Sequence, residues 1–153
     1  MEAARPARVE ELPRLAELAG AAGAAAAAFR GGELLTHGLR HEDPDAVRTW
    51  LEGYTSGTDR LLLAGTLHDS IVGVGAVRAR SNPAVGSFDV LYVEPDARSV
   101  GVGAAIVDAG TEWLRSAGCS GVDVVALPGA RDTKQFLEGA GLVARLIVMH
   151  RAL

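Results

Sequence analysis

Two glycines and an arginine lie close together between residues 98 and 103, in a setting that suits phosphate binding. The segment reads Arg98-Ser99-Val100-Gly101-Val102-Gly103 and follows an apolar segment that ends at Val93. A helix that starts here presents main-chain N–H groups without internal partners and the positive end of its dipole. Glycine lets a phosphate approach the backbone closely, and arginine adds a fixed positive charge with several donors. The residues therefore predict a pyrophosphate site.

Three kinds of nucleotide-binding loop compete for this segment. A Walker loop ends in Gly-Lys-Ser/Thr, whereas Gly103 is followed by two alanines, the first of them Ala104. A Rossmann fingerprint needs a third glycine where this chain has Ile106, and it should open the first strand–helix unit of a parallel sheet. Here the loop follows three consecutive predicted strands, so neither of these two loops fits.

The elements that position the loop are predicted from hydrophobic periodicity and turn residues. Helices are expected over 9–29, 44–54, 100–117 and 131–140, and strands over 3–8, 60–67, 71–80, 85–93, 122–127 and 142–151. Short turns join the three strands between residues 60 and 93, which predicts an antiparallel meander. The order β-α-α-β-β-β-α-β-α-β predicts an α/β fold, of the α+β kind. Its mixed, mostly antiparallel central sheet is flanked by helices in a single domain over residues 1–153.

The spacing Val93-x4-Arg98-x2-Gly101-x-Gly103 resembles the acetyl-CoA motif of the GNAT family of N-acetyltransferases. The resemblance covers nearly the whole chain and includes the run from Phe136 to Leu142, which looks like the family's second coenzyme helix. It implies a GNAT-like acyl-CoA N-acyltransferase fold, with acetyl-CoA as co-substrate. It also implies transfer of the acetyl group to an amine by direct attack in a ternary complex. A catalytically weak or silent acyl-CoA-binding or regulatory module is the alternative.

The resemblance further implies which residues hold the coenzyme. Main-chain groups of Leu91, Tyr92 and Val93 would bind the pantetheine arm, and the N–H of Val93 would polarise the thioester carbonyl. The phosphates would lie against the loop and first helical turn, formed by Arg98, Ser99, Val100, Gly101, Val102, Gly103 and Ala104. Arg131 and Lys134 are further candidate phosphate contacts, with an ordinary solvated helix start as the alternative.

Acetyl transfer to an amine also needs a proton acceptor, and Asp89 is the first candidate. It lies four residues before Val93, which resembles the base position in several family members. Strict alternation along a strand would place Asp89 on the same side as Leu91 and Val93. A solvated or ion-paired strand carboxylate is an equal alternative for Asp89, and Glu94 is a weaker candidate for the base.

The proton donor to the leaving thiolate is less clear, because the family often places a tyrosine on the last helix. Here that place holds Leu137, with Phe136 beside it. Tyr92, Tyr54 or water would then protonate the thiolate. A thiolate is also a tolerable leaving group without an acid, since the pKa of a thiol is about 8.5.

The acceptor side of the site is predicted between the first two helices, where His37 and His41 are candidate substrate-binding residues. Solvated loop histidines are the alternative for both. No group of His, Cys, Asp or Glu has the spacing of metal ligands, so no metal is expected. Cys119 has no histidine near it in sequence, which argues against a nucleophilic thiol.

Composition and charge limit the partners. The net charge is −4 with scattered basic residues, and nothing indicates nucleic acid. The absence of an 18-residue apolar run argues against a membrane span, and a single cysteine suits a reducing compartment, so a cytoplasmic protein is expected. The expected partner is a small-molecule or protein amine. After the helix over 131–140 only one strand is expected, and the sheet edge that it leaves predicts a homodimer.

Overall fold

A five-stranded sheet forms the centre of the computed structural model, which describes residues 1–37 and 39–153. The strands lie in the order β1-β2-β3-β4-β5. Neighbours from β1 to β4 run antiparallel, and β4 and β5 run parallel. This confirms the predicted mixed, mostly antiparallel sheet. The bounds are β1 (Glu2–Pro6), β2 (Arg60–Leu67), β3 (Ser70–Arg78), β4 (Val85–Val93) and β5 (Gly121–Val124).

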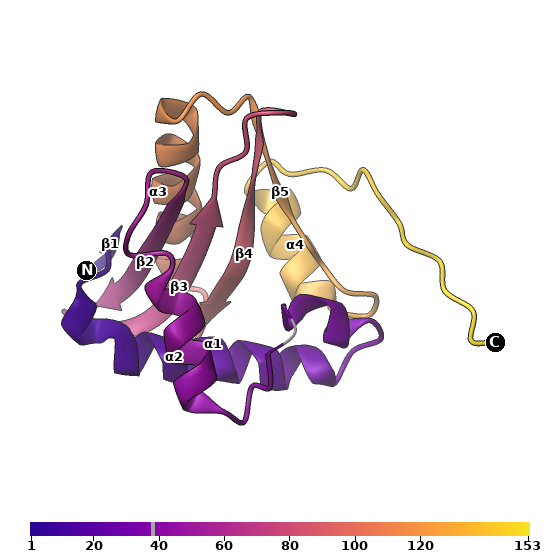
Figure 1. Ribbon diagram of the computed structural model, residues 1–153, viewed down its shortest axis with the longest axis horizontal. Coiled ribbons are helices and arrows are strands. Elements are labelled where there is room, and N and C mark those ends of the chain that lie inside the picture. Colours follow the sequence, from indigo (N-terminus) through magenta and orange to yellow (C-terminus); the bar gives the residue numbers. More distant parts are fainter. Residues whose placement is uncertain (38) are drawn as a thin grey trace.

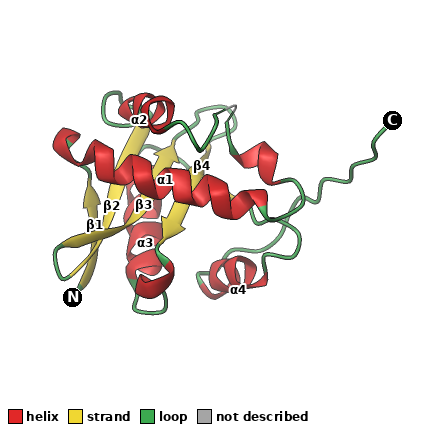
Figure 2. Cartoon of the chain, turned by 90° about the horizontal axis from the view of Figure 1, so that it is seen from below, coloured by secondary structure: helices red, strands yellow, loops and turns green. Residues whose placement is uncertain are grey.

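Helices cover both faces of the sheet (Figures 1 and 2). Helices α1 (Leu12–Ala27) and α2 (Pro44–Glu52) pack on one face, α3 (Val102–Ser116) packs on the other, and α4 (Arg131–Gly139) lies beside β5. Three short 3-10 helices, η1 (Val9–Glu11), η2 (Gly32–Leu35) and η3 (Pro95–Ala97), complete the described elements. The start of α2 is as predicted, because the Asp43 carboxylate accepts a hydrogen bond from the N–H of Ala46 at 3.1 Å.

Each face of the sheet buries its own apolar cluster. Leu15, Leu18 and Leu51 fill the α1–α2 side, and Ile106 and Leu114 of α3 fill the other. Glycines in the sheet let α3 approach closely. A Cβ built on Gly75 would lie 2.6 Å from Cγ2 of Ile106, and one on Gly65 would lie 2.6 Å from its Cδ1.

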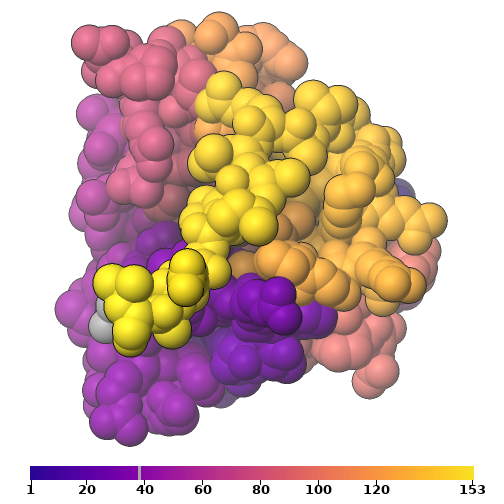
Figure 3. Space-filling model, turned by 90° about the vertical axis from the view of Figure 1, so that its right-hand side faces the viewer, coloured from indigo at the N-terminus to yellow at the C-terminus, as the bar shows by residue number. Residues whose placement is uncertain are grey.

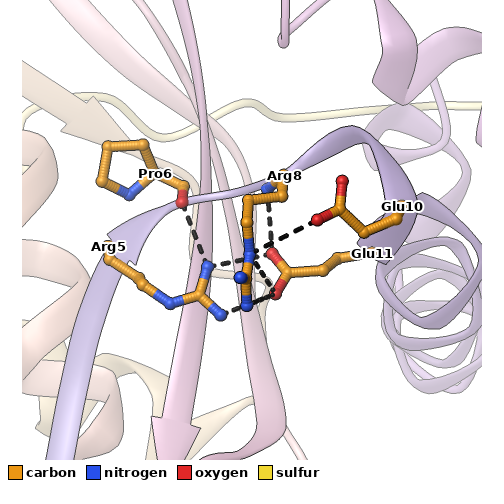
Figure 4. Close-up of polar contacts among 5 residues, drawn as sticks. All are labelled: Arg5, Pro6, Arg8, Glu10 and Glu11. Atoms are coloured by element: carbon orange, nitrogen blue, oxygen red, sulfur yellow. Dashed lines mark hydrogen bonds and ion pairs between the residues drawn. The ribbon is translucent and has the colours of Figure 1, made fainter.

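A cluster of charges fixes the connection from β1 into α1 (Figure 4). The Glu11 carboxylate accepts hydrogen bonds from the Arg5 guanidinium at 2.6 and 2.9 Å and from the main-chain N–H of Arg8 at 2.8 Å. The Arg8 guanidinium adds a further contact at 2.9 Å. These bonds lower the pKa of Glu11 to about 2, with the Arg5 hydrogen bond as the largest cause.

The chain after α4 differs from the prediction. The strand expected over 142–151 is wrong, because these residues form no strand and run as an exposed, extended segment. Val143 is 84% exposed, and Arg145 ion-pairs with Asp123 at 2.8 Å. Alternating apolar residues satisfied the strand pattern, but a strand also needs an edge to pair with. Within the described residues, segment 142–151 pairs with no strand, and the outer edge of β5 stays without a partner. The predicted end of β5 is also wrong, since pairing stops at Val124.

Candidate active site

The loop between β4 and α3 has the conformation that close approach to a phosphate requires. Gly101 is the N-cap of α3 with φ of 95°, a left-handed conformation, and Ser99 has φ of 65°. The Nε of Arg98 donates a hydrogen bond to the carbonyl of Val93 at 2.9 Å, which ties the loop to the end of β4. The first turn of α3, with the positive end of the helix dipole, begins four residues after this tethered arginine, at Val102.

Two side chains border this loop. A Cβ built on Gly103 would lie 3.1 Å from Cζ of Phe136, so α4 packs against the start of α3. A Cβ built on Gly101 would lie 3.0 Å from Cγ of Glu2 in β1. Glycine at these two positions avoids close contacts with the flanking elements.

Strand β4 loses its β5 partner halfway along its length. The parallel pairing joins Val85–Phe88 of β4 to Gly121–Val124 of β5 and ends there. Residues 90–93 continue to pair with β3 on one side only. The main-chain groups of Leu91, Tyr92 and Val93 that face away from β3 therefore have no partner strand, directly before the phosphate loop.

A β-bulge lies at Asp89, where the pairing with β5 ends. Val77 of β3 pairs with Phe88 and Ala76 pairs with Val90, so Asp89 is the extra residue without a β3 partner. The bulge overturns the expectation that Asp89 shares its side of the strand with Leu91 and Val93. Those two residues pack on the α3 side, whereas the Asp89 carboxylate reaches Tyr54, which belongs to the α1–α2 cluster. Strict alternation failed because the bulge inserts one residue into the period of two.

The Asp89 side chain is 5% exposed and is surrounded by donors. Its carboxylate accepts hydrogen bonds from the Tyr54 hydroxyl, from Oγ of Ser87 at 2.9 Å and from the Arg78 guanidinium at 3.1 Å. The Nε of Arg78 also lies 3.1 Å from Oδ2, although its direction does not make a hydrogen bond. The structure therefore contains Asp89 as an ion-paired carboxylate, and its role as a base stays a prediction.

Tyr54 is held as a proton donor in this cluster. Burial raises the pKa of the Tyr54 hydroxyl far above its ordinary value, and the hydrogen bond to Asp89 raises it further. A phenol that binds its proton this tightly is a poor acid for a leaving thiolate, so the proposal of Tyr54 as proton donor loses support.

The main-chain carbonyl of Asp89, at the bulge, forms a hydrogen bond with His37. The distance from Nε2 of His37 to the Asp89 carbonyl oxygen is 2.9 Å. A carbonyl can only accept, so Nε2 donates in this contact, and the neutral tautomer that fits it has its lone pair on Nδ1. The imidazole stacks on Trp50 with ring centroids 4.9 Å apart, and Trp50 packs against Tyr54 at 4.8 Å. His37 thus lies at the point where β4 loses its partner.

The other predicted site residues lie in different surroundings. His41 packs over the small residues of α1, since a Cβ on Gly23 would lie 2.8 Å from the Cβ of His41, and its imidazole faces Glu42 at 3.4 Å. The structure does not bring His41 to Asp89. Glu94 ion-pairs with Arg14 of α1 at 2.6 Å. The Tyr92 ring is half-buried beneath the Arg98 guanidinium, 5.6 Å from its centroid.

Neither Phe136 nor Leu137 of α4 carries a hydroxyl. Leu137 is buried, and Phe136 is the residue that contacts Gly103. Arg131 and Lys134 are exposed at the start of α4, where Lys134 ion-pairs with Glu138 at 2.9 Å. The departure noted at Leu137 therefore persists in three dimensions.

Three residues of the site were not predicted from the sequence. Trp50 is half-buried and supports the His37 ring. Arg78 and Ser87 are directly paired across β3 and β4. The meander register would have placed them together, but their convergence on Asp89 depends on the bulge, for which the sequence carries no clear signal.

Neither a metal centre nor a membrane span is found in the part of the chain that the structure describes. Over residues 1–37 and 39–153, no three His, Cys, Asp or Glu side chains group in a way that could hold a metal ion. No helix in these ranges has the length and apolar character to cross a bilayer.

Comparison with known proteins identifies the family. The model of the acetyltransferase (GNAT) family matches residues 25–137. A search of curated proteins finds no match.

Solved structures support the same fold at low sequence identity. Aminoglycoside N-acetyltransferase AAC(6')-Iy in complex with CoA has a TM-score of 0.77 at 14% identity, over 99% of this chain and 95% of that one. Glucosamine-6-phosphate N-acetyltransferase from Arabidopsis thaliana has a TM-score of 0.65 at 18% identity, over 99% and 98%. Ribosomal-protein-alanine N-acetyltransferase from Brucella melitensis biovar Abortus 2308 has a TM-score of 0.68 at 13% identity, over 100% of both chains.

The family match extends from the end of α1 into α4 and contains the open half of β4, the phosphate loop and the Asp89 cluster. The chain therefore belongs to the GNAT family of acetyl-CoA-dependent N-acetyltransferases.

Proposed function

We propose that this protein transfers the acetyl group of acetyl-CoA to an amine by direct attack in a ternary complex. The observation that carries the proposal is the unpaired half of β4, residues 89–93, which leads straight into the phosphate loop of α3. Main-chain groups of Leu91, Tyr92 and Val93 would bind the pantetheine arm in this gap. The thioester would then lie near the Val93 N–H, which stabilises the oxyanion formed on attack.

The loop residues supply the phosphate contacts in this proposal. Arg98, Ser99, Val100, Gly101, Val102, Gly103 and Ala104 would bind the pyrophosphate, with Arg131 and Lys134 as outer contacts. Support comes from the left-handed Gly101 and from Arg98, which the Val93 carbonyl holds beside the loop. The residues fit acyl-CoA because a strand without a partner and an open helix N-terminus offer main-chain donors in sequence along an extended ligand.

The acceptor amine would approach from the α1–α2 side, next to His37 and Asp89. The lone pair on Nδ1 of His37 can accept a hydrogen bond from an amine N–H, and the Trp50 ring beneath it fixes the imidazole plane. Asp89, held in its buried cluster, would border the acceptor site on the α1–α2 side, and it remains the proposed base. Tyr92 remains the proposed proton donor to the thiolate. His41 is proposed only as an outer acceptor contact, because it lies over α1.

The acceptor class extends over small molecules and proteins. The solved structures with this fold include enzymes named for an aminoglycoside, for glucosamine-6-phosphate and for a ribosomal protein. We further propose a single domain over residues 1–153 and a homodimer in the cytoplasm.

A second candidate function is a weak or silent acyl-CoA-binding module. Phe136 at the loop and buried Leu137 favour it, since neither can protonate a thiolate. Release of free thiol from acetyl-CoA with a panel of primary amines distinguishes the two functions. Turnover with any amine establishes the enzyme, whereas coenzyme binding without turnover across the panel establishes the module.

The coenzyme assignment is tested by Gly101→Glu with Gly118→Glu as its control. Both glycines have left-handed φ values, 95° and 88°, so both variants carry similar backbone strain. Only the first places a carboxylate at the phosphate loop. Acetyl-CoA at a hundred times its Kd stabilises a protein by about 2.7 kcal/mol, which raises the Tm of a chain this size by about 5–10 °C.

We expect this thermal shift in the wild type and in Gly118→Glu, and its loss in Gly101→Glu. The Kd of Gly101→Glu should rise at least about a hundredfold, equivalent to about 2.7 kcal/mol. Equal coenzyme affinity in the two variants would show that the phosphates bind elsewhere. The absence of any shift in the wild type at saturating coenzyme would remove both candidate functions.

A further inference from the structure

A row of polar side chains crosses the sheet on its α1–α2 face, next to the Asp89 cluster. Cross-strand pairing aligns its four members, which are Arg60 of β2, Arg78 of β3, Ser87 of β4 and Asp123 of β5. The adjacent row on this face contains Leu62 and Ala76, which are buried in the α1–α2 cluster. The apolar interior of this face therefore ends at the polar row, whose charged members reach solvent.

Arg60 and Arg78 place two positive charges directly opposite each other in this row. The Cβ atoms of directly opposite strand residues lie about 5 Å apart, and like charges at such positions destabilise a sheet. The Asp89 carboxylate neutralises Arg78, whose Nη2 donates to Oδ1 at 3.1 Å. Asp123 does not compensate Arg60, because it ion-pairs with Arg145 at 2.8 Å. These two carboxylates therefore leave the charge of one guanidinium uncompensated.

Arg60 is the guanidinium without a carboxylate partner. Its Cζ lies over the Tyr54 ring, 5.3 Å from the centroid, and it forms no ion pair with any described residue. A cation–π contact holds a guanidinium in place without supplying an acceptor oxygen for its five N–H donors. Burial raises the pKa of the Tyr54 hydroxyl, and the charges of Arg60 and Arg78 both oppose that rise. Both guanidinia thus lie close to the same phenol.

Arg78 also has donors left over. Its Nε–Nη2 edge faces Asp89, with Nε 3.1 Å from Oδ2. Its Nη1 forms no hydrogen bond with the residues that the structure describes, and the side chain is 34% exposed. The free edge of Arg78 and the half-buried guanidinium of Arg60 therefore offer several N–H donors on neighbouring strands, without an acceptor from the described chain.

The charge of this region is opposite to that of the chain. Three arginines, Arg60, Arg78 and Arg145, and two aspartates, Asp89 and Asp123, leave one positive charge here, whereas the net charge of the chain is −4. Arg145 belongs to the segment after α4, which Figure 3 shows running over the face that contains α4. A local positive charge on an acidic protein attracts an anionic ligand. The row therefore favours a ligand group of negative charge.

Asp89 connects the two guanidinia to the proposed acceptor site. Its main-chain carbonyl accepts a hydrogen bond from Nε2 of His37 at 2.9 Å, and its carboxylate accepts one from Arg78. The packed rings of His37, Trp50 and Tyr54 form a second connection, since the Tyr54 ring lies beneath the other guanidinium. A short acceptor whose amine lies at Nδ1 of His37 can therefore place a second group at the guanidinia.

We propose that Arg60 and Arg78 bind an oxyanion, a carboxylate or a phosphate, that the acceptor carries in addition to its amine. The role of the ligand as acceptor rests on the acetyl transfer proposed above, whereas oxyanion binding needs no turnover. A bound oxyanion relieves the repulsion between the two opposite guanidinia and accepts from N–H groups that lack an acceptor. A carboxylate matches one guanidinium in a bidentate manner, and a phosphate has oxygens for both.

The first experiment measures binding of short ω-amino carboxylates and aminoalkyl phosphates by NMR titration of the full chain, with and without coenzyme A. Each anionic amine is compared with a neutral analogue of the same length, an amino amide or an amino alcohol. We expect the anionic member to bind at least about tenfold more tightly, equivalent to 1.4 kcal/mol. The relative affinities of carboxylates and phosphates identify the source of the oxyanion. Equal affinities of anionic and neutral members at every chain length would overturn the proposal.

The second experiment uses a matched pair of substitutions, Arg60→Gln and Arg48→Gln. Both remove one positive charge from a side chain that reaches solvent, but Arg48 lies on α2 and pairs with Glu52 at 4.0 Å. We expect Arg60→Gln to lower the ratio of anionic to neutral affinity at least about tenfold, and Arg48→Gln to leave the ratio unchanged. Arg60→Lys should keep part of the preference, because it keeps the charge. Equal ratios in the two glutamine variants would contradict the assignment of the site to Arg60.

Acetyl transfer to the same pairs of amines completes the test. In the wild type, kcat/KM should favour the anionic member at least about tenfold, through a lower KM. Turnover of both members with equal kcat/KM would overturn the recognition of an anionic acceptor and leave the proposed function intact. No turnover with any amine would remove the proposed function alone, since the binding preference of the first two experiments does not depend on turnover. The two proposals therefore fail independently.

Discussion

Replacing Asp89 by asparagine separates the two interpretations of this carboxylate. In the wild type, Asp89 accepts hydrogen bonds from three side chains and neutralises Arg78 in a nearly closed cluster. An asparagine keeps one acceptor oxygen but presents an NH₂ group to a partner that also donates. It also leaves the Arg78 guanidinium without its counter-ion.

The expected cost follows from these losses. A hydrogen bond to a charged group contributes about 1.5–3 kcal/mol, and an uncompensated buried charge costs about 3–5 kcal/mol. The Arg78 side chain is 34% exposed, so solvent screens much of the second term. We therefore expect Asp89→Asn to lower the free energy of unfolding by about 2 kcal/mol. For a chain of this length, that corresponds to a fall in Tm of about 4–8 °C.

Thermal unfolding and steady-state kinetics are measured together on Asp89→Asn and on a control, Glu112→Gln. Glu112 also ion-pairs with one arginine, Arg115, but both side chains are more than 60% exposed, so its loss should barely change Tm. If Asp89 mainly holds the cluster together, Tm falls and kcat falls no more than about tenfold. A kcat lower by about a hundredfold or more at unchanged Tm would refute this reasoning and identify Asp89 as the base.

Two further predictions concern the frame around the site. The pKa of Glu11 is lowered from 4.5 to about 2, so its contribution to stability is complete above pH 4.5 and is lost as the pH falls toward 2. Glu11→Gln should lower the unfolding free energy at pH 7 by at most about 3 kcal/mol, and it should reduce the loss of that free energy between pH 4.5 and 2, as measured by urea denaturation. Glu10→Gln, at an exposed position, should change neither quantity. Gly75→Ala places a Cβ 2.6 Å from Ile106 and should cost about 1–3 kcal/mol, whereas Gly139→Ala, with open space around it, should leave stability equal or slightly higher; equal stability of the two variants by chemical denaturation would show that α3 does not pack as described.

The sequence predicted most of the fold because its signals are local. The periodicity of the helices, the Asp43-Pro44 start of α2 and the glycine loop before α3 each depend on a few neighbouring residues, and all three agree with the structure. The strand expected over 142–151 was wrong because strand formation depends on a partner that is distant in sequence. Its residues have the right alternation, but whether they form a strand depends on an edge supplied by another part of the molecule or by another molecule.

The site was predicted in part for the same reason. The position of Asp89 before Val93 was predicted from spacing, but the predicted side of the strand was wrong because the bulge at Asp89 shifts the alternation by one residue. The contacts from Arg78 and Ser87 to Asp89, and the stacking of His37 on Trp50, bring together residues from four separate segments. Contacts of this kind depend on tertiary packing, which spacing along one strand does not encode.

The bulge at Asp89 changes the parity of β4. Before it, even-numbered residues such as Phe88 point toward α3, and after it the odd-numbered Leu91 and Val93 do so. The two halves of one strand therefore meet the same helix with opposite parity. A single unpaired residue thus lets both halves of β4 bury apolar side chains against α3 while the carboxylate of Asp89 turns to the opposite face of the sheet, so one insertion in the ladder places a charged group among apolar neighbours without interrupting their packing.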